Sequence, residues 1–189
     1  MKTLILNGSP RKNGTVSKLL HTLADNVSIK NEIEWIDVYD LNIKPCLGCM
    51  KCRDTHECVL PVDDGQKVGE KMGKADVLVI GSPTYWGNMS GVLKILFERN
   101  VYRLMGEGKH GIPIPLQKGK KAVIVTACTT PAPFSYLFKQ SRGTVHAIKE
   151  ILKYAGYKTA AKIIKAGSKS KPEISNGLIK KTIRAAKSL

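Results

Sequence analysis

The sequence lacks any apolar stretch that could cross a membrane, because no run approaches the roughly 20 residues that a spanning helix needs. It also lacks a secretory signal pattern, since the short apolar segment Met1–Leu6 leads directly into a polar loop. The common nucleotide loops GxGxxG and GxxxxGK[ST] are absent as well. We therefore expect a cytoplasmic protein with no membrane segment.

Acidic and aromatic residues are scarce. The 189 residues include 15 Asp and Glu against 31 Lys and Arg, for a formal net charge of +16, and only 6% are aromatic. Such a charge is compatible with a nucleic-acid-binding module, because cations displace the counterions of phosphate backbones. The excess is spread over the chain, however, and neither a nucleic-acid-reading motif nor many stacking aromatics accompany it. We expect no nucleic-acid partner, and we interpret the basic segment after Tyr157 as a solvated helix face, with attraction of an anionic dinucleotide as the alternative.

Short apolar runs alternate with helical patterns along the chain. The runs are Thr3–Leu6, Ile33–Val38, Asp76–Gly81, Lys121–Thr126 and Tyr157–Ile164. This alternation predicts an α/β fold, a doubly wound five-stranded parallel sheet of order 2-1-3-4-5 with helices on both faces. We expect one domain over residues 1–189, with a cysteine-rich loop at 45–60 and a further loop at 111–120. In such a sheet the ligand lies beyond the carboxyl ends of the strands, where the strand order reverses.

The first run ends in a turn rich in glycine, hydroxyl groups and positive charge, Asn7–Thr15. Small and hydroxylated residues at the N-terminus of a helix present free amides and hydroxyls to an anion. The turn therefore predicts a phosphate-binding loop, and one that holds a terminal phosphate. An ordinary strand-to-helix turn is the alternative, because Ser, Asn and Thr are also common helix caps.

The third run leads into a second unusual loop, Pro83-Thr84-Tyr85-Trp86-Gly87-Asn88-Met89. Its aromatic pair offers flat apolar surface to a planar ring, and its glycine lets backbone amides approach the polar edge of that ring. The alternative is that Tyr85 and Trp86 anchor the loop in the core. The fourth run ends at Cys128-Thr129-Thr130, where the two threonines can donate hydrogen bonds to the same ligand.

In the loop after the first run, Asn7–Thr15, and in the loop after the third run, the sequence resembles the NADPH-dependent FMN reductase branch of the flavodoxin-like superfamily. The resemblance extends through Leu93-Lys94 and Glu98-Arg99. It implies a flavodoxin-like fold, non-covalent FMN, NAD(P)H as electron donor and assembly as a homodimer or homotetramer. The residues that it implies around the FMN phosphate are Ser9, Arg11, Asn13, Thr15, Val16 and Ser17. Those that it implies around the ring are Pro83, Thr84, Tyr85, Trp86, Gly87, Asn88, Met89 and Thr129. No catalytic side chain is expected, because the chemistry belongs to the flavin.

Four of the five cysteines fall within thirteen positions, at Cys46, Cys49, Cys52 and Cys58. Disulfides are disfavoured in the cytosol, so this crowding indicates metal binding or redox chemistry. The C-x2-C-x2-C-x5-C spacing resembles that of the iron–sulfur flavoproteins and predicts one [4Fe–4S] cluster that relays electrons between FMN and a partner. A zinc site and a metal-free thiol loop are the alternatives. We expect His56 to be a surface residue and Cys128 to be no ligand.

Together these features predict an oxidoreductase that takes a hydride from NAD(P)H onto FMN and passes electrons to a flavin, a quinone or another small-molecule or protein acceptor. The first alternative is an iron–sulfur flavoprotein that relays electrons between proteins without oxidising a nicotinamide itself. The second is a basic nucleic-acid-binding module.

Overall fold

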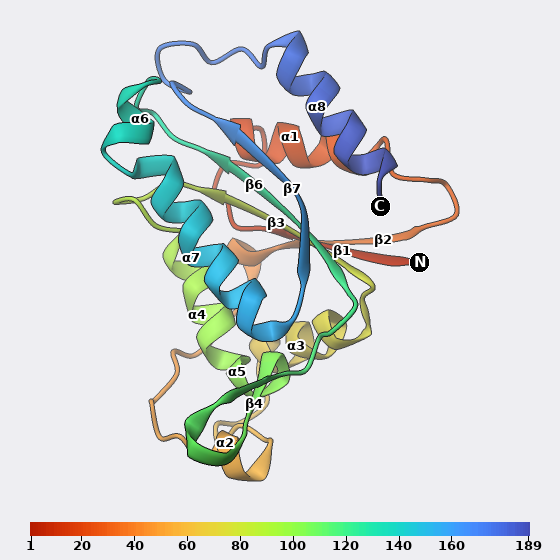
Figure 1. Ribbon diagram of the computed structural model, residues 1–189, viewed down its shortest axis with the longest axis vertical. Coiled ribbons are helices and arrows are strands. Elements are labelled where there is room, and N and C mark those ends of the chain that lie inside the picture. The colour runs from red at the N-terminus through yellow and green to blue at the C-terminus, as the bar shows by residue number, and fades with distance from the viewer.

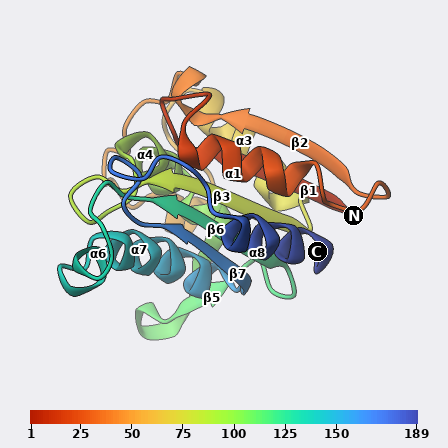
Figure 2. The same ribbon diagram turned by 90° about the horizontal axis from the view of Figure 1, so that it is seen from above.

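The computed structural model describes residues 1–189 and contains a five-stranded, all-parallel sheet (Figure 1). Its order is β2-β1-β3-β6-β7, which confirms the predicted topology because β6 and β7 are the fourth and fifth strands of the sheet. Figure 2 shows β2 and β7 at the two opposite edges. The bounds of the sheet strands are β1 Lys2–Asn7, β2 Glu32–Asp37, β3 Val77–Pro83, β6 Lys121–Ala127 and β7 Lys158–Lys165.

Helices cover both faces of this sheet, so the core lies in two layers. On one face α1 and α8 pack over the side chains of Ile5, Val79 and Val125. On the other, α3, α4 and α7 cover Leu4, Leu6 and neighbouring strand residues. Successive side chains of a strand point to opposite faces, and a parallel sheet covered on both faces is therefore apolar along its whole strands.

The helices begin and end where the sequence places suitable residues. Asp63 accepts a hydrogen bond from Gly65 N (2.8 Å), and Gln66 Oε1 accepts one from Asp63 N (2.8 Å), which together form a capping box at the start of α3. Gly156, with φ +92°, ends α7 in the left-handed conformation that glycine adopts without strain. The helix bounds are α1 Thr15–Ala24, α2 Cys52–Thr55, α3 Asp64–Lys74, α4 Gly91–Arg99, α5 Val101–Leu104, α6 Phe134–Leu137, α7 Gln140–Ala155 and α8 Asn176–Lys187.

A small hairpin departs from the predicted loop at 111–120. Strand β4, Met105–Glu107, pairs antiparallel with β5, Pro113–Pro115. Prolines cannot donate to a ladder and are tolerated on edge strands, so this two-stranded ribbon accepts them at both ends of β5. No helix of the structure has both the length and the apolar character needed to cross a membrane.

Candidate functional site

Four loops meet above the carboxyl ends of β1, β3, β6 and β7 and enclose a hollow of about 130 Å³. The main-chain ladder continues one step past the first three strands, through Gly8 N to Gly81 O (2.8 Å), Thr84 N to Ala127 O (2.9 Å) and Cys128 N to Lys165 O (2.9 Å). Because of these bonds, the loops leave the sheet at the same height along the strand direction. The lining residues are Ser9, Pro10, Arg11, Gly14, Thr15, Val16, Pro83, Thr84, Tyr85, Ala127, Cys128, Thr129 and Ser168.

The N-terminus of α1 opens onto this hollow with free donors. The amides of Thr15, Val16 and Ser17 donate to no oxygen of the chain, and Gly14 at the cap has no side chain to satisfy them. The first turn of α1 also carries no acidic residue. Free amides and the positive end of the helix dipole together favour an anion at this position.

The loop that precedes α1 is held by its own hydroxyl groups. Ser9 is buried, and its Oγ accepts a hydrogen bond from Arg11 N (3.2 Å). Ser17 Oγ donates to Arg11 O (2.8 Å) and also lies 3.1 Å from Asn7 Nδ2, so its hydroxyl points away from the hollow. Lys12 pairs with Asp40 (2.7 Å), which raises the pKa of Lys12. Arg11 is exposed and has no acidic partner, and so it keeps its charge available to an anion.

The second loop is a tight turn that presents its aromatic residues outward. Tyr85 N donates to Asn88 O (3.0 Å) and Asn88 N donates to Tyr85 O (2.9 Å), with Trp86 (φ +51°) and Gly87 (φ +72°) between them. Two central residues with positive φ are typical of a type I′ turn. Trp86 is fully exposed and Tyr85 nearly half exposed, so the interpretation of this pair as core anchors is wrong.

A chain of hydroxyl groups supports this turn from below. The Thr144 hydroxyl lies 3.0 Å from Asn88 O and 3.0 Å from Thr84 Oγ1, which in turn lies 3.3 Å from Thr126 Oγ1. The Thr144 hydroxyl is the donor in both contacts, so Asn88 O and Thr84 Oγ1 accept from it. The N-terminal part of α7 is also packed tightly against the turn, because a Cβ at Gly143 would lie 2.0 Å from Gly87 O. The turn is thus fixed by β6 and α7 together.

The structure brings eight of the predicted cofactor residues to the hollow, namely Ser9, Arg11, Thr15, Val16, Pro83, Thr84, Tyr85 and Thr129. The other six, Asn13, Ser17, Trp86, Gly87, Asn88 and Met89, do not line it. Among these, Met89 has its side chain in the core. Ser168 was not predicted; its Oγ donates to Cys128 O (3.0 Å), and it reaches the hollow from the loop after β7. A hydroxyl following the fifth strand was the only signal that could have indicated it.

The cysteine loop is exposed and turns repeatedly. Cys46 and Cys49 are exposed, Cys52 and Cys58 are half-buried, and all four are free thiols. Gly48 N donates to Cys46 Sγ (3.4 Å), and Gly48, Met50 and His56 adopt positive φ. Burial raises the pKa of the Cys52 thiol, and the three neighbouring cysteines raise it further. As placed, no group of three or more His, Cys, Asp or Glu side chains is arranged to hold a metal ion.

A buried arginine ties the two ends of this loop together. Arg99 Nη2 donates to Asp63 Oδ2 (3.2 Å) and to Gln66 Oε1 (3.0 Å), and its side chain is fully buried. Asp63 Oδ2 also accepts a hydrogen bond from Lys44 N (3.0 Å), ahead of the cysteines. Gln66 Nε2 donates to Leu60 O (3.1 Å), behind them. We call this set of contacts the Arg99 anchor.

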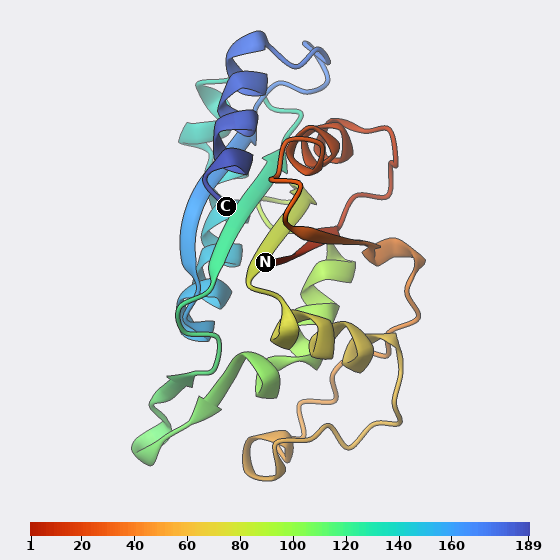
Figure 3. The same ribbon diagram turned by 90° about the vertical axis from the view of Figure 1, so that its right-hand side faces the viewer.

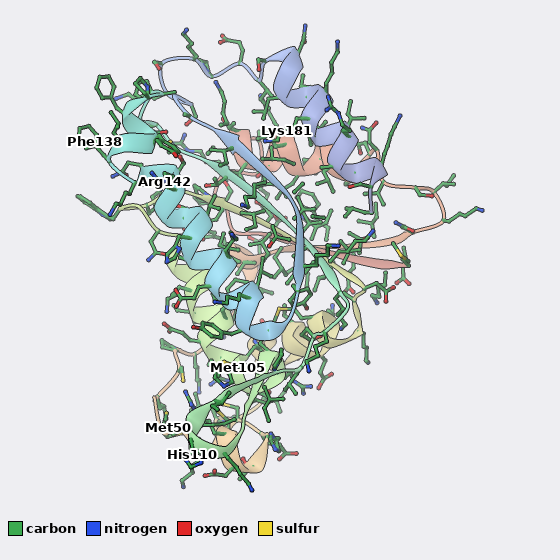
Figure 4. All side chains as sticks on the ribbon, in the orientation of Figure 1. Met50, Met105, His110, Phe138, Arg142 and Lys181 are labelled. Atoms are coloured by element: carbon green, nitrogen blue, oxygen red, sulfur yellow. The ribbon has the colours of Figure 1, made fainter.

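Beyond this anchor the loop extends away from the hollow. Near β2 the chain still lies close to the hollow, because burial, with the neighbouring Tyr85, raises the pKa of Tyr39. Helix α2, by contrast, lies beside the β4–β5 hairpin, to which Arg53 is joined by an ion pair with Glu107 (Figure 3). Met50 and Phe138 therefore mark opposite ends of the molecule (Figure 4).

The sheet, its strand order and the loops at its carboxyl edge define a flavodoxin-like α/β protein. The family model for NADPH-dependent FMN reductase matches residues 1–132 of the 189. The chain belongs to this family, which confirms the predicted resemblance.

Several curated relatives carry a more specific name. An iron-sulfur flavoprotein of Archaeoglobus fulgidus is 44% identical over 107 residues, which are 56% of this chain and 52% of that protein. An iron-sulfur flavoprotein of Methanocaldococcus jannaschii is 34% identical over 101 residues, 53% of this chain and 52% of that protein. This chain thus spans about half the length of the relatives that it matches.

Solved structures share the fold over nearly the whole chain. The protein Smu.1420 of Streptococcus mutans superposes with a TM-score of 0.80 at 23% identity and covers 100% of both chains. An FMN-dependent NADH-azoreductase of Bacillus anthracis, solved in complex with FMN, has a TM-score of 0.71 at 13% identity and covers 98% of this chain and 95% of that one. At these identities the likeness establishes the fold.

The Arg99 anchor predicts a large effect of Arg99→Leu on stability. The substitution leaves Asp63 and Gln66 without their shared donor, and breaking a buried ion pair from one side costs about 3 kcal/mol or more. Arg103→Leu is the matched control, because Arg103 pairs with the exposed Glu70 (3.3 Å) and should lose less than about 1 kcal/mol. Urea unfolding of both variants measures the difference, and equal losses would show that the anchor contributes nothing special.

Proposed function

We propose that this protein is a flavoprotein oxidoreductase that binds FMN in the hollow above β1, β3 and β6, accepts a hydride from NAD(P)H and passes electrons to a flavin, a quinone or another acceptor. The observation that carries the proposal is the set of free amides at the N-terminus of α1, which open onto the same hollow as Thr84 and Tyr85. The same hollow thus offers donors for the phosphate of FMN and an aromatic side chain for its ring.

The residues of the first loop fit a phosphate dianion. Three unpaired amides supply donors along the helix axis, and the hydroxyls of Ser9 and Thr15 stand beside them. Arg11 adds an uncompensated charge at the rim. Donors to a charged group contribute more than neutral pairs do, so a small number of them suffices to fix the phosphate end of FMN.

The second loop fits the planar end of the same ligand. Tyr85 lines the hollow, while Gly87 leaves backbone groups of the turn open to approach. Support from Thr84 and Thr144 keeps the turn in place, which orients a ring laid against it. When bound there, FMN supplies the hydride- and electron-transfer chemistry, and the chain supplies position and access. No acid or base from the protein is required.

The exposed aromatic helix α6 supports a homodimer or homotetramer. Phe134, Tyr136, Leu137 and Phe138 all remain more than half exposed beside the turn at Gly87. Apolar side chains gathered on a surface are typical of a contact with another chain. The oligomer would cover the open side of the hollow.

A second activity, electron relay through one [4Fe–4S] cluster, is supported by the cysteine loop. Cys46, Cys49, Cys52 and Cys58 offer the four thiolates that such a cluster needs, and the bond from Gly48 N to Cys46 Sγ is of the kind that tunes cluster sulfurs. The Arg99 anchor fixes both ends of the segment that carries the four thiols. A zinc ion bound by the same thiolates is the competing occupant.

For the phosphate assignment, we expect the double variant Ser9→Ala/Thr15→Ala to bind FMN at least about tenfold more weakly. Each hydrogen bond to a charged group contributes about 1.5–3 kcal/mol, and 1.4 kcal/mol corresponds to tenfold in affinity. Quenching of flavin fluorescence measures the dissociation constant. Thr22→Ala is the control, since the Thr22 hydroxyl donates to Lys18 O within α1 and Thr22 does not line the hollow. Unchanged affinity in the double variant would contradict the assignment.

For the electron donor, we expect NAD(P)H to bleach the bound flavin rapidly in the absence of oxygen. The reaction is followed by flavin absorbance with each nicotinamide separately, which also reports the preference between NADH and NADPH. If neither donor bleaches the flavin while a reduced electron-transfer protein does, the relay function replaces the reductase.

For the cysteine loop, we expect anaerobic reconstitution to yield about four iron and four sulfide per chain. Each single Cys→Ser change at positions 46, 49, 52 and 58 should lower that content. Cys128→Ser is the control that should retain it, because Cys128 is buried at the hollow away from α2. Stoichiometric zinc, or thiols that take up no iron, would instead assign the loop a zinc-binding or structural role.

A further inference from the structure

The C-terminal part of the chain carries charge that nothing in the fold neutralises. Residues 134–189 contain thirteen Lys and Arg against only Glu150 and Glu173. None of these thirteen cations forms an ion pair, whereas Glu150 lies 4.0 Å from His146 on the same helix. Ion pairs elsewhere, such as Lys2 with Glu34 (3.3 Å), show that the chain does pair its cations where acidic residues are available.

Much of this charge lines one trough between α7 and the edge strand β7. Two adjoining hollows of about 570 and 680 Å³ share His146 and Lys149 and together form what we call the basic trough. Helix α7 has 16 residues, which corresponds to about 24 Å in length. The cations of the trough are Lys139, Arg142, Lys149, Lys153, Lys158 and Lys162.

Like charges are held close together within the trough. Lys149 and Lys162 both line the hollow at the upper end of the trough, and the charge of Lys149 lowers the pKa of Lys162, with burial and Lys181 adding to the effect. Glu150 is the only acidic residue that lines the trough. An anionic surface laid over this trough would relieve the repulsion between the two ammonium groups.

The basic trough begins at the turn that we assign to the flavin ring. Gly143, which lines its upper end, packs against Gly87 so closely that an added Cβ would meet Gly87 O at 2.0 Å. Lys139 O lies 3.6 Å from where a Cβ of Gly87 would stand. Arg142 lies over the Tyr136 ring, 4.2 Å from its centroid, and Figure 4 shows Arg142 and Phe138 at the same end of the molecule.

We propose that the basic trough docks an acidic electron-transfer protein beside the flavin edge. The inference rests on the proposed flavin function. Six cations along α7 and the neighbouring edge of β7 exceed what a small anion needs, and complementary charge is what brings transient partners together rapidly. Tyr154 is the one exposed aromatic of the trough, and the Lys153 ammonium lies 5.6 Å from its ring centroid, so the trough offers little stacking surface to a nucleic acid. In the transfer, two oxidised one-electron carriers each gain one electron, and the reduced flavin loses two electrons and a proton.

Charge reversal tests the proposal by direct binding. The trough variant is Arg142→Glu/Lys149→Glu/Lys162→Glu. The matched control is Lys18→Glu/Lys30→Glu/Lys74→Glu, which changes the net charge equally at exposed, unpaired cations outside the trough. The probe is an acidic [2Fe–2S] ferredoxin, titrated by calorimetry at low salt. We expect the dissociation constant to rise at least about tenfold in the trough variant and less than about threefold in the control. Added salt should weaken wild-type binding, because it screens exposed charges.

Three results would overturn the docking. They are equal weakening in both variants, no ferredoxin binding by the wild type at low salt, and tighter binding of a 20-base-pair DNA duplex that the trough variant alone loses. FMN titration and NAD(P)H bleaching of the trough variant separate this inference from the proposed function. If both are normal while ferredoxin binding is absent, only the docking is wrong. If the wild type binds no FMN, the flavin function is wrong, and the ferredoxin titration still decides the docking.

Discussion

The continuation of the parallel hydrogen-bond ladder past the strand ends is the constraint on which the site depends. Gly8, Thr84 and Cys128 each donate to the neighbouring strand one residue beyond the sheet, so three loops leave the sheet at the same level. Gly8 is essential to this arrangement, because a Cβ there would stand 2.1 Å from Leu93 Cδ1 of α4. The loops after β1, β3 and β6 converge because these ladder bonds fix where each of them begins.

Most of the fold could be predicted because its signals are local. The apolar runs, the acid at the start of α3 and the spacing along α1 each follow from neighbouring residues, and the structure agrees with them to within a few residues. The β4–β5 hairpin was missed because Pro113 and Pro115 indicate a loop when pairing is judged from the sequence alone. An edge strand tolerates proline where the missing N–H faces no partner strand. Whether it does so depends on which strand lies opposite, and the local sequence does not show this.

The site was less predictable, because a side chain's orientation depends on contacts distant in sequence. Ser17 stays a predicted phosphate residue through its free amide, while its hydroxyl donates to Arg11 O and accepts from Asn7 Nδ2. Ser168 was missed because only the bond to Cys128 O brings it to the hollow. The Arg99 anchor joins residues 36 positions apart, so no local pattern reveals that Arg99 and Asp63 hold the two ends of one loop. Buried charged side chains are therefore the feature that is hardest to predict from the sequence.

The distribution of acidic residues explains where the positive charge remains. Asp63 and Asp64 hold the base of the cysteine loop, through Lys44 N and Asn42 N. Asp76 binds the amide of Lys2, and Asp40 binds Lys12. All of these lie in the first half of the chain, where acids are engaged in caps, anchors and ion pairs. With so few acidic residues in total, the C-terminal third keeps its cations unpaired, and six of them line the basic trough between α7 and β7. Because the sequence has few acidic residues, a positively charged surface remains beside the turn at which the proposed chemistry would occur.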